Sequence, residues 1–146
     1  MSPETSSPVL FGDVLALARE SWIREMSTRL AERGYPGYRR ADPLVVRWLV
    51  HGTLPLGWLT TKLGVSRQSA RKVISGLVER HYAHVLTDES DSRRRNVELT
   101  PRGRDYASAV IEVLLALNRE IATKVDPDQL EAALAVLGYV KDNLGP

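Results

Sequence analysis

The sequence contains no cysteine and only three histidines among its 146 residues. Disulfides, thiolate metal sites, a cysteine nucleophile and a thiol redox sensor are therefore excluded. The histidines are His51, His81 and His84. Two neighbouring histidines do not make a structural zinc site, so we expect no metal and no other cofactor.

Long apolar runs are also missing, since no stretch reaches the roughly 18 apolar residues of a membrane span. The N-terminal segment MSPETSSPVL lacks the positive start and apolar run of a secretory signal. We therefore expect a cytoplasmic protein that does not contact membranes.

Enzyme motifs are absent as well. The chain has no glycine-rich phosphate loop, no nucleophile elbow and no metal constellation. A general base could be assembled only from His81 or His84 with a nearby acid, in a segment with no pocket to support it. We predict that the chain is not an enzyme.

The charges that are present lie unevenly along the chain. Charged residues make up 26% of the sequence and hydrophobic residues 43%, the balance of a globular domain. Between Thr53 and Arg104 there are ten cations and five anions. This segment therefore has a net charge of +5, whereas the whole chain has a net charge of +2. A basic middle indicates either a polyanionic partner or a solvated helix face, and charge alone does not decide between them.

The N-terminal part reads as a loose tail over residues 1–7, followed by helices over residues 8–52. Apolar residues recur every three or four positions up to Arg33, and Gly34 is placed to end that helix. Asp42 followed by Pro43 is a typical start for a second helix. Its expected inward side chains are Leu44, Val45, Trp48 and Leu49.

Residues 53–100 have the proportions of a winged helix-turn-helix. A short helix over 55–63 is stopped by Gly64, and Ser66 caps a second helix that runs to Arg80. Two short strands, 82–86 and 95–99, then flank the polar loop 87–92 and predict a hairpin. The expected interior of the helix pair is Leu56, Leu59, Leu63 and Val65 against Ala70, Ile74 and Leu77.

Residues 101–146 predict a long helix from Pro101 to Lys124 and a last helix opened by Asp126. The first and the last two helices carry more apolar surface than a small winged core covers. They pack either on each other within one chain or against a second copy, and we favour a homodimer. The predicted fold class is mainly α with a small β-hairpin wing (α+β), a winged helix-turn-helix lobe joined to helical dimerisation regions.

The second helix of the helix-turn-helix presents a polar face suited to reading DNA. Glutamine and serine pair with base edges, arginine grips guanine, and lysine contacts phosphate. We place Gln68, Ser69 and Lys72 nearest the bases, with Arg71 a contender, and expect Arg67 to contact phosphate. The candidate residues of this face are Ser66, Arg67, Gln68, Ser69, Arg71, Lys72 and Ser75.

The hairpin tip carries Asp91 followed by Arg93, Arg94 and Arg95. Three adjacent arginines repel one another unless a polyanion or a carboxylate is near. We predict that Asp91 pairs with Arg93 and stiffens the tip. Arg94 or Arg95 then reaches a DNA backbone or a narrow minor groove.

The pattern Asp91-x-Arg93-x-x-x-Val97-x-Leu99-Thr100-x-x-Gly103-Arg104, downstream of Leu63-Gly64-Val65-Ser66-Arg67-Gln68, resembles the MarR family of bacterial regulators. The resemblance implies a triangular homodimer that binds double-stranded DNA at a pseudo-palindromic operator, usually as a repressor. The sequence departs from the family at His81, where a glycine usually follows the recognition helix. Either that helix ends differently or His81 adopts the left-handed conformation.

The resemblance also implies a small, often aromatic, anionic effector held between the dimer helices and the winged lobe. Trp58 lies in the lobe and is a further candidate to face that gap. For each aromatic residue, plain core packing is the alternative, and a winged module that binds protein remains a third function class. The candidate effector residues are Trp22, Met26, Arg47, Trp48, His51 and Tyr106.

Overall fold

A computed structural model describes residues 10–145 of the chain. The chain divides into two compact units, the first ending at Ile111 and the second beginning at Glu112. The elements in chain order are α1 (Phe11–Glu32), α2 (Asp42–Leu49), β1 (Leu54–Pro55), α3 (Leu56–Lys62), α4 (Arg67–Glu79), β2 (Ala83–Thr87), β3 (Arg95–Leu99), α5 (Pro101–Lys124) and α6 (Pro127–Asn143). The predicted tail, residues 1–7, lies outside the described residues.

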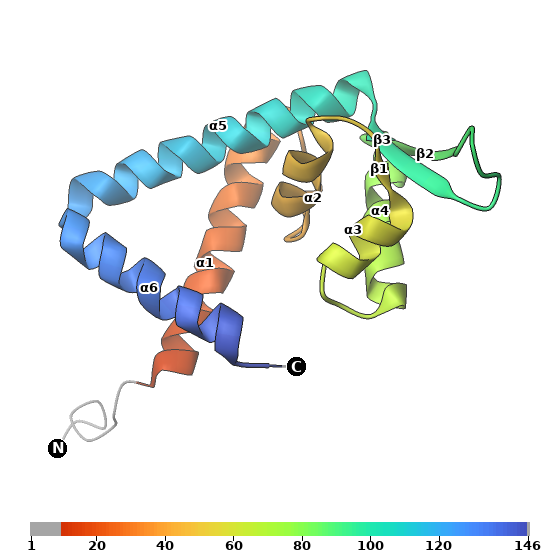
Figure 1. The fold of residues 1–146 in the computed structure, drawn as a ribbon. Coiled ribbons are helices and arrows are strands. Elements are labelled where there is room, and N and C mark those ends of the chain that lie inside the picture. The colour runs from red at the N-terminus through yellow and green to blue at the C-terminus, as the bar shows by residue number, and fades with distance from the viewer. Residues whose placement is uncertain (1–9, 146) are drawn as a thin grey trace, which may run out of the picture. The chain divides into compact units, whose positions relative to one another are not determined.

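The first unit is a winged helix-turn-helix, as the sequence predicts. Helices α2, α3 and α4 gather beside a small sheet, and the β2–β3 hairpin projects beyond them (Figure 1). The sheet has the order β1-β3-β2 with antiparallel pairs, and Val97 lies opposite both Leu54 and Val85. The short strand β1 was not predicted. Its two residues carry no strand pattern of their own. The strand forms because its backbone pairs with the edge of β3.

Helix α2 buries Val45 and Leu49 as predicted, but its buried stripe is turned slightly from the predicted one. Its buried residues Asp42, Val45, Val46 and Leu49 follow the helical spacing of three and four. Leu44 lies off that stripe, and its side chain is 45% exposed, so the prediction that it points inward is wrong.

The helix-turn-helix itself forms as predicted, but three residues of its expected interior, Leu56, Leu63 and Val65, are not buried, and of these Leu56 and Leu63 are half-buried. Gly64 takes a φ of +66° in the turn, and the Ser66 hydroxyl accepts a hydrogen bond from the Ser69 N–H at 3.1 Å. Leu59, Ala70, Ile74 and Leu77 are buried. Val65 is 52% exposed, contrary to prediction, because the turn points it into a surface hollow.

Helix α4 ends through His81, which adopts the left-handed conformation at a φ of 64°. The His81 N–H donates to the Val78 carbonyl, and the Tyr82 N–H donates to the Leu77 carbonyl at 2.9 Å. This is the bonding of a Schellman cap, built here without glycine. One of the two predicted alternatives at His81 is therefore confirmed, and β2 begins at Ala83.

Thr100 and Gly103 join the start of α5 to the end of α4. The Thr100 hydroxyl donates to the His81 carbonyl at 2.6 Å and accepts from the Gly103 N–H at 2.9 Å. A Cβ on Gly103 would lie 1.7 Å from the Tyr82 carbonyl oxygen. These two motif residues are therefore structural, because they allow α5 to approach the backbone that follows α4.

The second unit contains the rest of α5 and the whole of α6. The Asp126 N–H donates to the Gln129 side chain at 2.9 Å, one half of the expected capping arrangement. No residue of α6 is buried, and Leu134, Leu137, Tyr139 and Leu144 are exposed. Over residues 10–145, no helix combines the length and the apolar content that crossing a membrane requires.

Candidate nucleic-acid interface

The exposed side of α4 divides into a crest and two flanks. Successive residues turn by about 100° around a helix, so Gln68, Lys72 and Ser75 point away from the buried stripe of Ala70, Ile74 and Leu77 and form this crest. The exposed Arg67 and Arg71 lie on one side of this crest. The exposed Ser69 lies on the other side, next to Lys72 of the crest, and each flank faces its own hollow.

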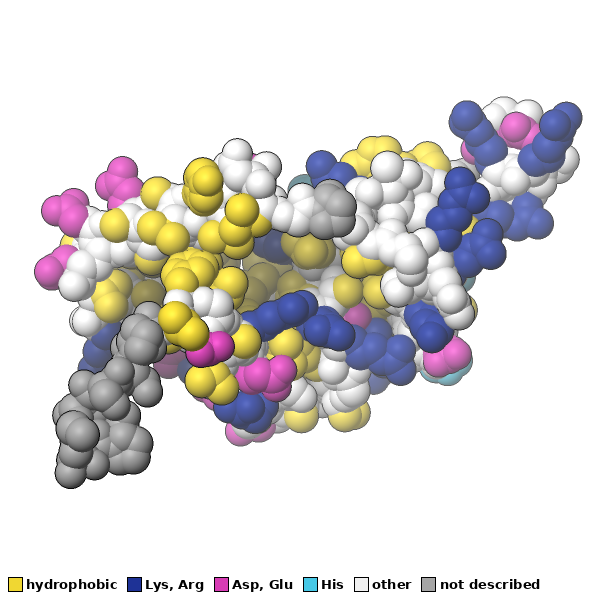
Figure 2. Space-filling model, turned by 90° about the horizontal axis from the view of Figure 1, so that it is seen from below, with side chains coloured by type: hydrophobic (Ala, Val, Ile, Leu, Met, Phe, Trp, Pro, Cys, Tyr) yellow, Lys and Arg dark blue, Asp and Glu magenta, His cyan; other side chains and the backbone are white. Residues whose placement is uncertain are grey.

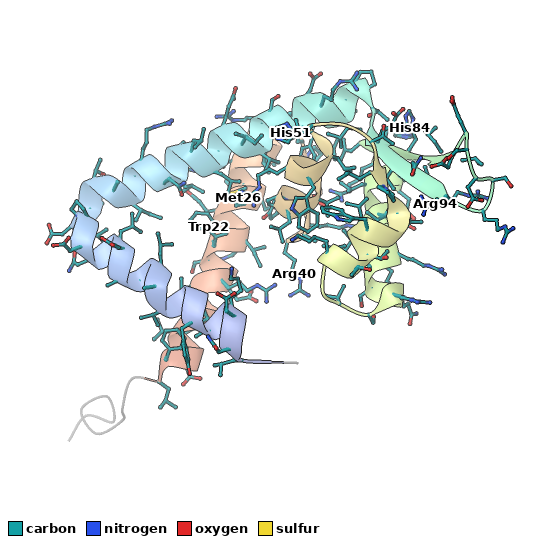
Figure 3. All side chains as sticks on the ribbon, in the orientation of Figure 1. Trp22, Met26, Arg40, His51, His84 and Arg94 are labelled. Carbon is teal, nitrogen blue, oxygen red and sulfur yellow. The ribbon has the colours of Figure 1, made fainter. Side chains whose placement is uncertain are left out.

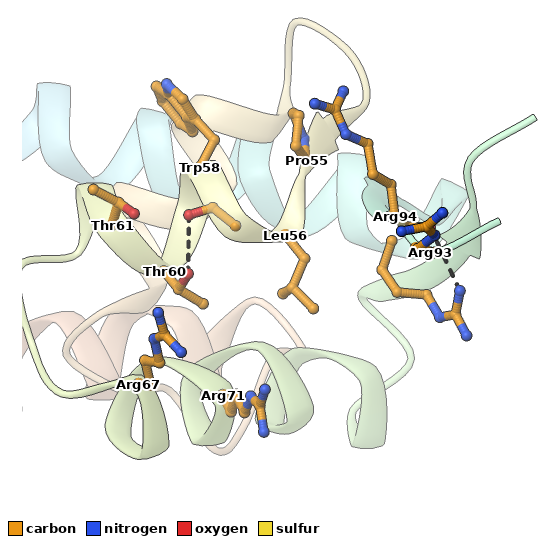
Figure 4. Close-up of a pocket in the computed structure, with 11 residues that line it drawn as sticks. Pro55, Leu56, Trp58, Thr60, Thr61, Arg67, Arg71, Arg93 and Arg94 are labelled. Carbon is orange, nitrogen blue, oxygen red and sulfur yellow. Dashed lines mark hydrogen bonds between the residues drawn. The ribbon is translucent and has the colours of Figure 1, made fainter. Parts of the chain in front are cut away.

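The first hollow, which we call the wing hollow, lies between helices α3 and α4 and the β2–β3 hairpin (Figure 4). Its volume is about 620 Å³. Helix α4 contributes Arg67 and Arg71, and no acidic side chain lines it. The full lining is Pro55, Leu56, Gly57, Trp58, Thr60, Thr61, Arg67, Arg71, Arg93, Arg94 and Arg95.

The structure therefore brings together candidates from two separate parts of the sequence. Arg67 and Arg71 of α4 meet Arg93, Arg94 and Arg95 of the hairpin. Sequence reasoning missed the walls that α3 supplies, because an apolar or hydroxyl side chain at the start of a short helix carries no distinctive pattern. Lys and Arg side chains gather at the hairpin end of the molecule in Figure 2.

The hairpin loop is ordered by Asp88, which the sequence did not single out. Its carboxylate accepts from the Ser90 N–H at 2.8 Å, the Ser90 hydroxyl at 2.6 Å and the Asn96 amide at 3.1 Å. The hydrogen bonds from Ser90, followed by that from Asn96, lower the pKa of Asp88 to about 2. The loop thus holds a fixed negative charge at its base while the arginines extend from its tip.

Asp91 supports the tip through the backbone rather than through the predicted ion pair. Its carboxylate accepts from the Arg93 N–H at 3.0 Å, the usual local bond of an aspartate in a turn. The Arg93 guanidinium is therefore not used by Asp91, and the prediction of a side-chain pair is wrong. The Arg95 guanidinium donates to the Ser92 carbonyl at 3.0 Å.

A buried ion pair holds the end of α4. Asp42 is 1% exposed, and its two oxygens accept from the Arg80 guanidinium at 2.6 and 2.9 Å. Arg80 also donates to the carbonyls of Gly76 and Gly37. Burial lowers the pKa of Arg80, but the hydrogen bonds and charge of Asp42 outweigh burial and leave it raised.

Tyr106 completes this buried cluster from α5. Its hydroxyl donates to Asp42 at 2.6 Å, and its ring stacks on Tyr82 with centroids 4.1 Å apart. Burial, reinforced by the negative charge of Asp42, raises the pKa of Tyr106. The sequence indicated Asp42 as a helix start only, because nothing in its spacing relates it to Arg80 or Tyr106.

The six candidate effector residues do not line either large hollow of the first unit. Met26 and Tyr106 are fully buried, whereas Arg47 and His51 are exposed. Trp22 and Met26 lie along α1 (Figure 3). His51 follows the C-terminal end of α2, whereas Arg40 precedes its N-terminal end. Trp48 packs edge-on against Trp58, which itself lines the wing hollow.

The histidines do not form a metal site. Within residues 10–145, no group of three or more histidine, aspartate or glutamate side chains could hold a metal ion. His84 instead contacts Glu98 at 2.6 Å across the β2–β3 ladder. The hydrogen bond from His84, supported by one from Thr53, lowers the pKa of Glu98.

Comparison with known proteins establishes the fold. No protein-family model matches the sequence, and no curated protein matches it. Among solved structures, S. aureus MepR bound to DNA superposes with a TM-score of 0.79 at 13% identity, covering 94% of this chain and 100% of that one. A mutant E. coli MarR in complex with operator DNA gives a TM-score of 0.73 at 17% identity, covering 88% and 91%.

A third neighbour is the transcriptional regulator BldR from Sulfolobus solfataricus, with a TM-score of 0.65 at 21% identity, covering 86% of this chain and 91% of that one. All three cover most of both chains. The chain therefore has the winged-helix fold of the MarR-type regulators, as the resemblance of its hairpin motif implies.

Proposed function

We propose that this chain is a MarR-type transcription regulator that binds double-stranded DNA through α4 and the hairpin. The observation that carries the proposal is the wing hollow, where five arginines from two elements meet without an acidic side chain. A concentration of positive charge beside an exposed helix is the electrostatic footprint of a nucleic-acid reader. The neighbours MarR and MepR, which share the fold, were solved with DNA.

In this proposal α4 enters the major groove with its crest toward the base edges. Gln68, Lys72 and Ser75 lie on the crest, where Gln68 and Ser75 read bases, while Ser69 lies at its edge. Arg67 and Arg71 face the backbone on the hairpin side. Arg93, Arg94 and Arg95 then contact phosphates or enter the adjacent minor groove, with Asp91 and Asp88 fixing the loop that carries them.

We further propose that the chain acts as a homodimer on a pseudo-palindromic operator. No residue of α6 is buried, so its large apolar side chains are exposed to water in the single chain. A second copy of the chain would cover them, because in a symmetric dimer each α6 packs against its counterpart. Two α4 helices then reach half-sites about 10 base pairs apart, one turn of the duplex.

The regulatory role that fits this arrangement is a cytoplasmic repressor that responds to a small aromatic anion. Its effector site is proposed around residues of the first unit, which are Trp22, Met26, Arg47, Trp48, His51 and Tyr106. Catalysis has little support, since the described residues gather no nucleophile, base and pocket together. A protein-binding winged module is less well supported too, because it has no need of an arginine-lined hollow.

The test is the salt dependence of binding to a duplex selected from a random pool. A regulator that neutralises 6–10 phosphates loses roughly 10³-fold or more in affinity between 50 and 200 mM salt, because counterions are released on binding. We expect a steep linear fall of the logarithm of the binding constant with the logarithm of the salt concentration. Failure to select any duplex, or binding that is insensitive to salt, would contradict the proposal.

A further inference from the structure

The second hollow of the first unit, which we call the α1–α2 hollow, lies on the opposite flank of α4 from the hairpin. Its volume is about 590 Å³, close to that of the wing hollow. It is lined by Arg19, Arg39, Arg40, Ala41, Leu44, Leu63, Val65, Ser69, Lys72 and Val73. It thus joins α1 and the segment before α2 to the exposed edge of the recognition helix.

The charge of this hollow has one sign. It contains four cations, Arg19, Arg39, Arg40 and Lys72, and no acidic side chain. All four are exposed, and no carboxylate among residues 10–145 forms an ion pair with them. A band of Lys and Arg side chains crosses the middle of the face shown in Figure 2, apart from the group at the hairpin end.

The position of the hollow identifies its partner. A helix in the major groove lies between the two phosphate backbones that border the groove, and the groove is about 12 Å wide. Arg67 and Arg71 line the wing hollow on one flank of α4, whereas Ser69 and Lys72 line the α1–α2 hollow on the other. The two hollows therefore lie where the two backbones run.

We propose that the α1–α2 hollow is a second phosphate-binding site, which holds the DNA backbone on the far side of the major groove from the hairpin. Arg19 and Arg40 contact phosphates directly. Lys72 contacts the same strand from α4, and the exposed Leu44 and Val65 pack against deoxyribose. This inference rests on the proposed DNA-binding function and extends the interface into helices that the sequence assigned to dimerisation.

Arg39 has a different part in this site. Its guanidinium packs over Gly76, where an added Cβ would lie 2.4 Å from Nη1, and its backbone N–H donates to Asp42 at 3.0 Å. Gly76 also accepts from Arg80. Substituting Arg39 would therefore disturb the end of α4. The test uses Arg19 and Arg40, whose side chains form no recorded hydrogen bond or ion pair within residues 10–145.

The experiment measures the salt dependence of binding for Arg40→Gln, Arg19→Gln and the double variant against the selected duplex. The slope for B-DNA falls by about 0.9 for each phosphate contact removed. We expect each single variant to lower the slope by about that amount per protomer and the double variant by twice as much. Arg119→Gln, the same change at an exposed arginine of the second unit, is the matched control and leaves the slope unchanged.

Ethylation interference locates the contact. With the wild-type protein, we expect modified phosphates to interfere on both strands bordering the major groove, and Arg40→Gln should lose only the set away from the hairpin. If the wild type binds steeply with salt but Arg19 and Arg40 variants match Arg119→Gln, this inference is overturned while DNA binding stands. If the wild type itself fails to bind, the proposed function is overturned.

Discussion

A buried carboxylate is stable only when its charge is matched, and Asp42 is matched from three directions. Arg80 supplies two hydrogen bonds, Tyr106 supplies one, and the Arg39 N–H supplies a fourth. Breaking a buried pair from one side leaves an uncompensated charge, which is far less stable than replacing both partners with apolar groups. The pair therefore specifies where α4 ends relative to α2 and α5.

The corresponding prediction concerns Arg80→Met. We expect this variant to lose about 3–5 kcal/mol in the free energy of unfolding, measured with urea, because Asp42 remains buried and charged. The double variant Asp42→Leu with Arg80→Met should lose clearly less than the single variant. Equal losses would show that an unpaired Asp42 does not itself destabilise the folded protein.

Asp88 gives a prediction about pH. Its hydrogen bonds from Ser90, Asn96 and Asp91 form only in the ordered loop and lower its pKa to about 2, below the ordinary value of 3.8. The ionised carboxylate therefore stabilises the ordered loop at every pH above the ordinary pKa. This stabilisation is lost as the pH falls toward 2.

We expect an NMR titration of the Asp88 carboxyl to have its midpoint near 2. The amide protons of Ser90 and Asp91 should remain protected from exchange at pH 4 and lose protection only below it. Asp88→Ala, which removes the accepting oxygens, should remove that protection at every pH. An ordinary midpoint near 4 would mean that the loop is not held by this side chain.

Among the elements of the proposed DNA interface, α4 and the hairpin should contribute different terms to binding. A base contact changes sequence preference, whereas a phosphate contact changes affinity for every sequence. Gln68 lies on the crest of α4, and Arg94 lies in the wing hollow with no acidic partner within residues 10–145.

We expect Arg94→Ala to weaken binding to all duplexes by a similar factor and to lower the salt slope by about 0.9 per protomer. Gln68→Ala should instead reduce the discrimination against one wrong base pair, an effect of about 1–3 kcal/mol. Competition binding against a panel of single-base variants of the operator measures both. Identical profiles for the two variants would contradict this division.

The helices and strands also show how much of the fold and of the site could be predicted from the sequence. Periodicity and capping residues gave the helices to within a few residues, because Ser66, Gly64 and Thr100 act locally. The strand β1 and the burial of Val46 in place of Leu44 depend on contacts between distant segments, which periodicity does not report. For the same reason the sequence found the arginines of the wing hollow and missed those of the α1–α2 hollow, which come from α1 and from the segment between α1 and α2.

For the whole molecule, the main question is what covers the apolar side chains that the single chain leaves exposed. Leu134 is 61% exposed and Leu137 41% exposed on α6, and Phe11 and Leu17 of α1 are exposed as well. Single exposed leucines are ordinary on a soluble protein, but a helix with no buried residue that carries several of them marks an interaction surface. If the proposed operator consists of paired half-sites, dimerisation would also determine how strongly it is bound.

We therefore expect Leu134→Asp combined with Leu137→Asp to convert a dimer into a folded monomer. Sedimentation at micromolar concentration measures the change in mass, and circular dichroism should show the helices retained, because neither residue is buried in the single chain. The monomer should bind a half-site as weakly as nonspecific DNA, since one α4 and one hairpin make only half of the contacts. Ala132→Asp adds one aspartate on the opposite side of α6 and should remain dimeric, whereas the single variant Leu134→Asp should not. A wild-type protein that sediments as a monomer would refute the dimer, and the two hollows of one protomer would then have to supply the whole affinity.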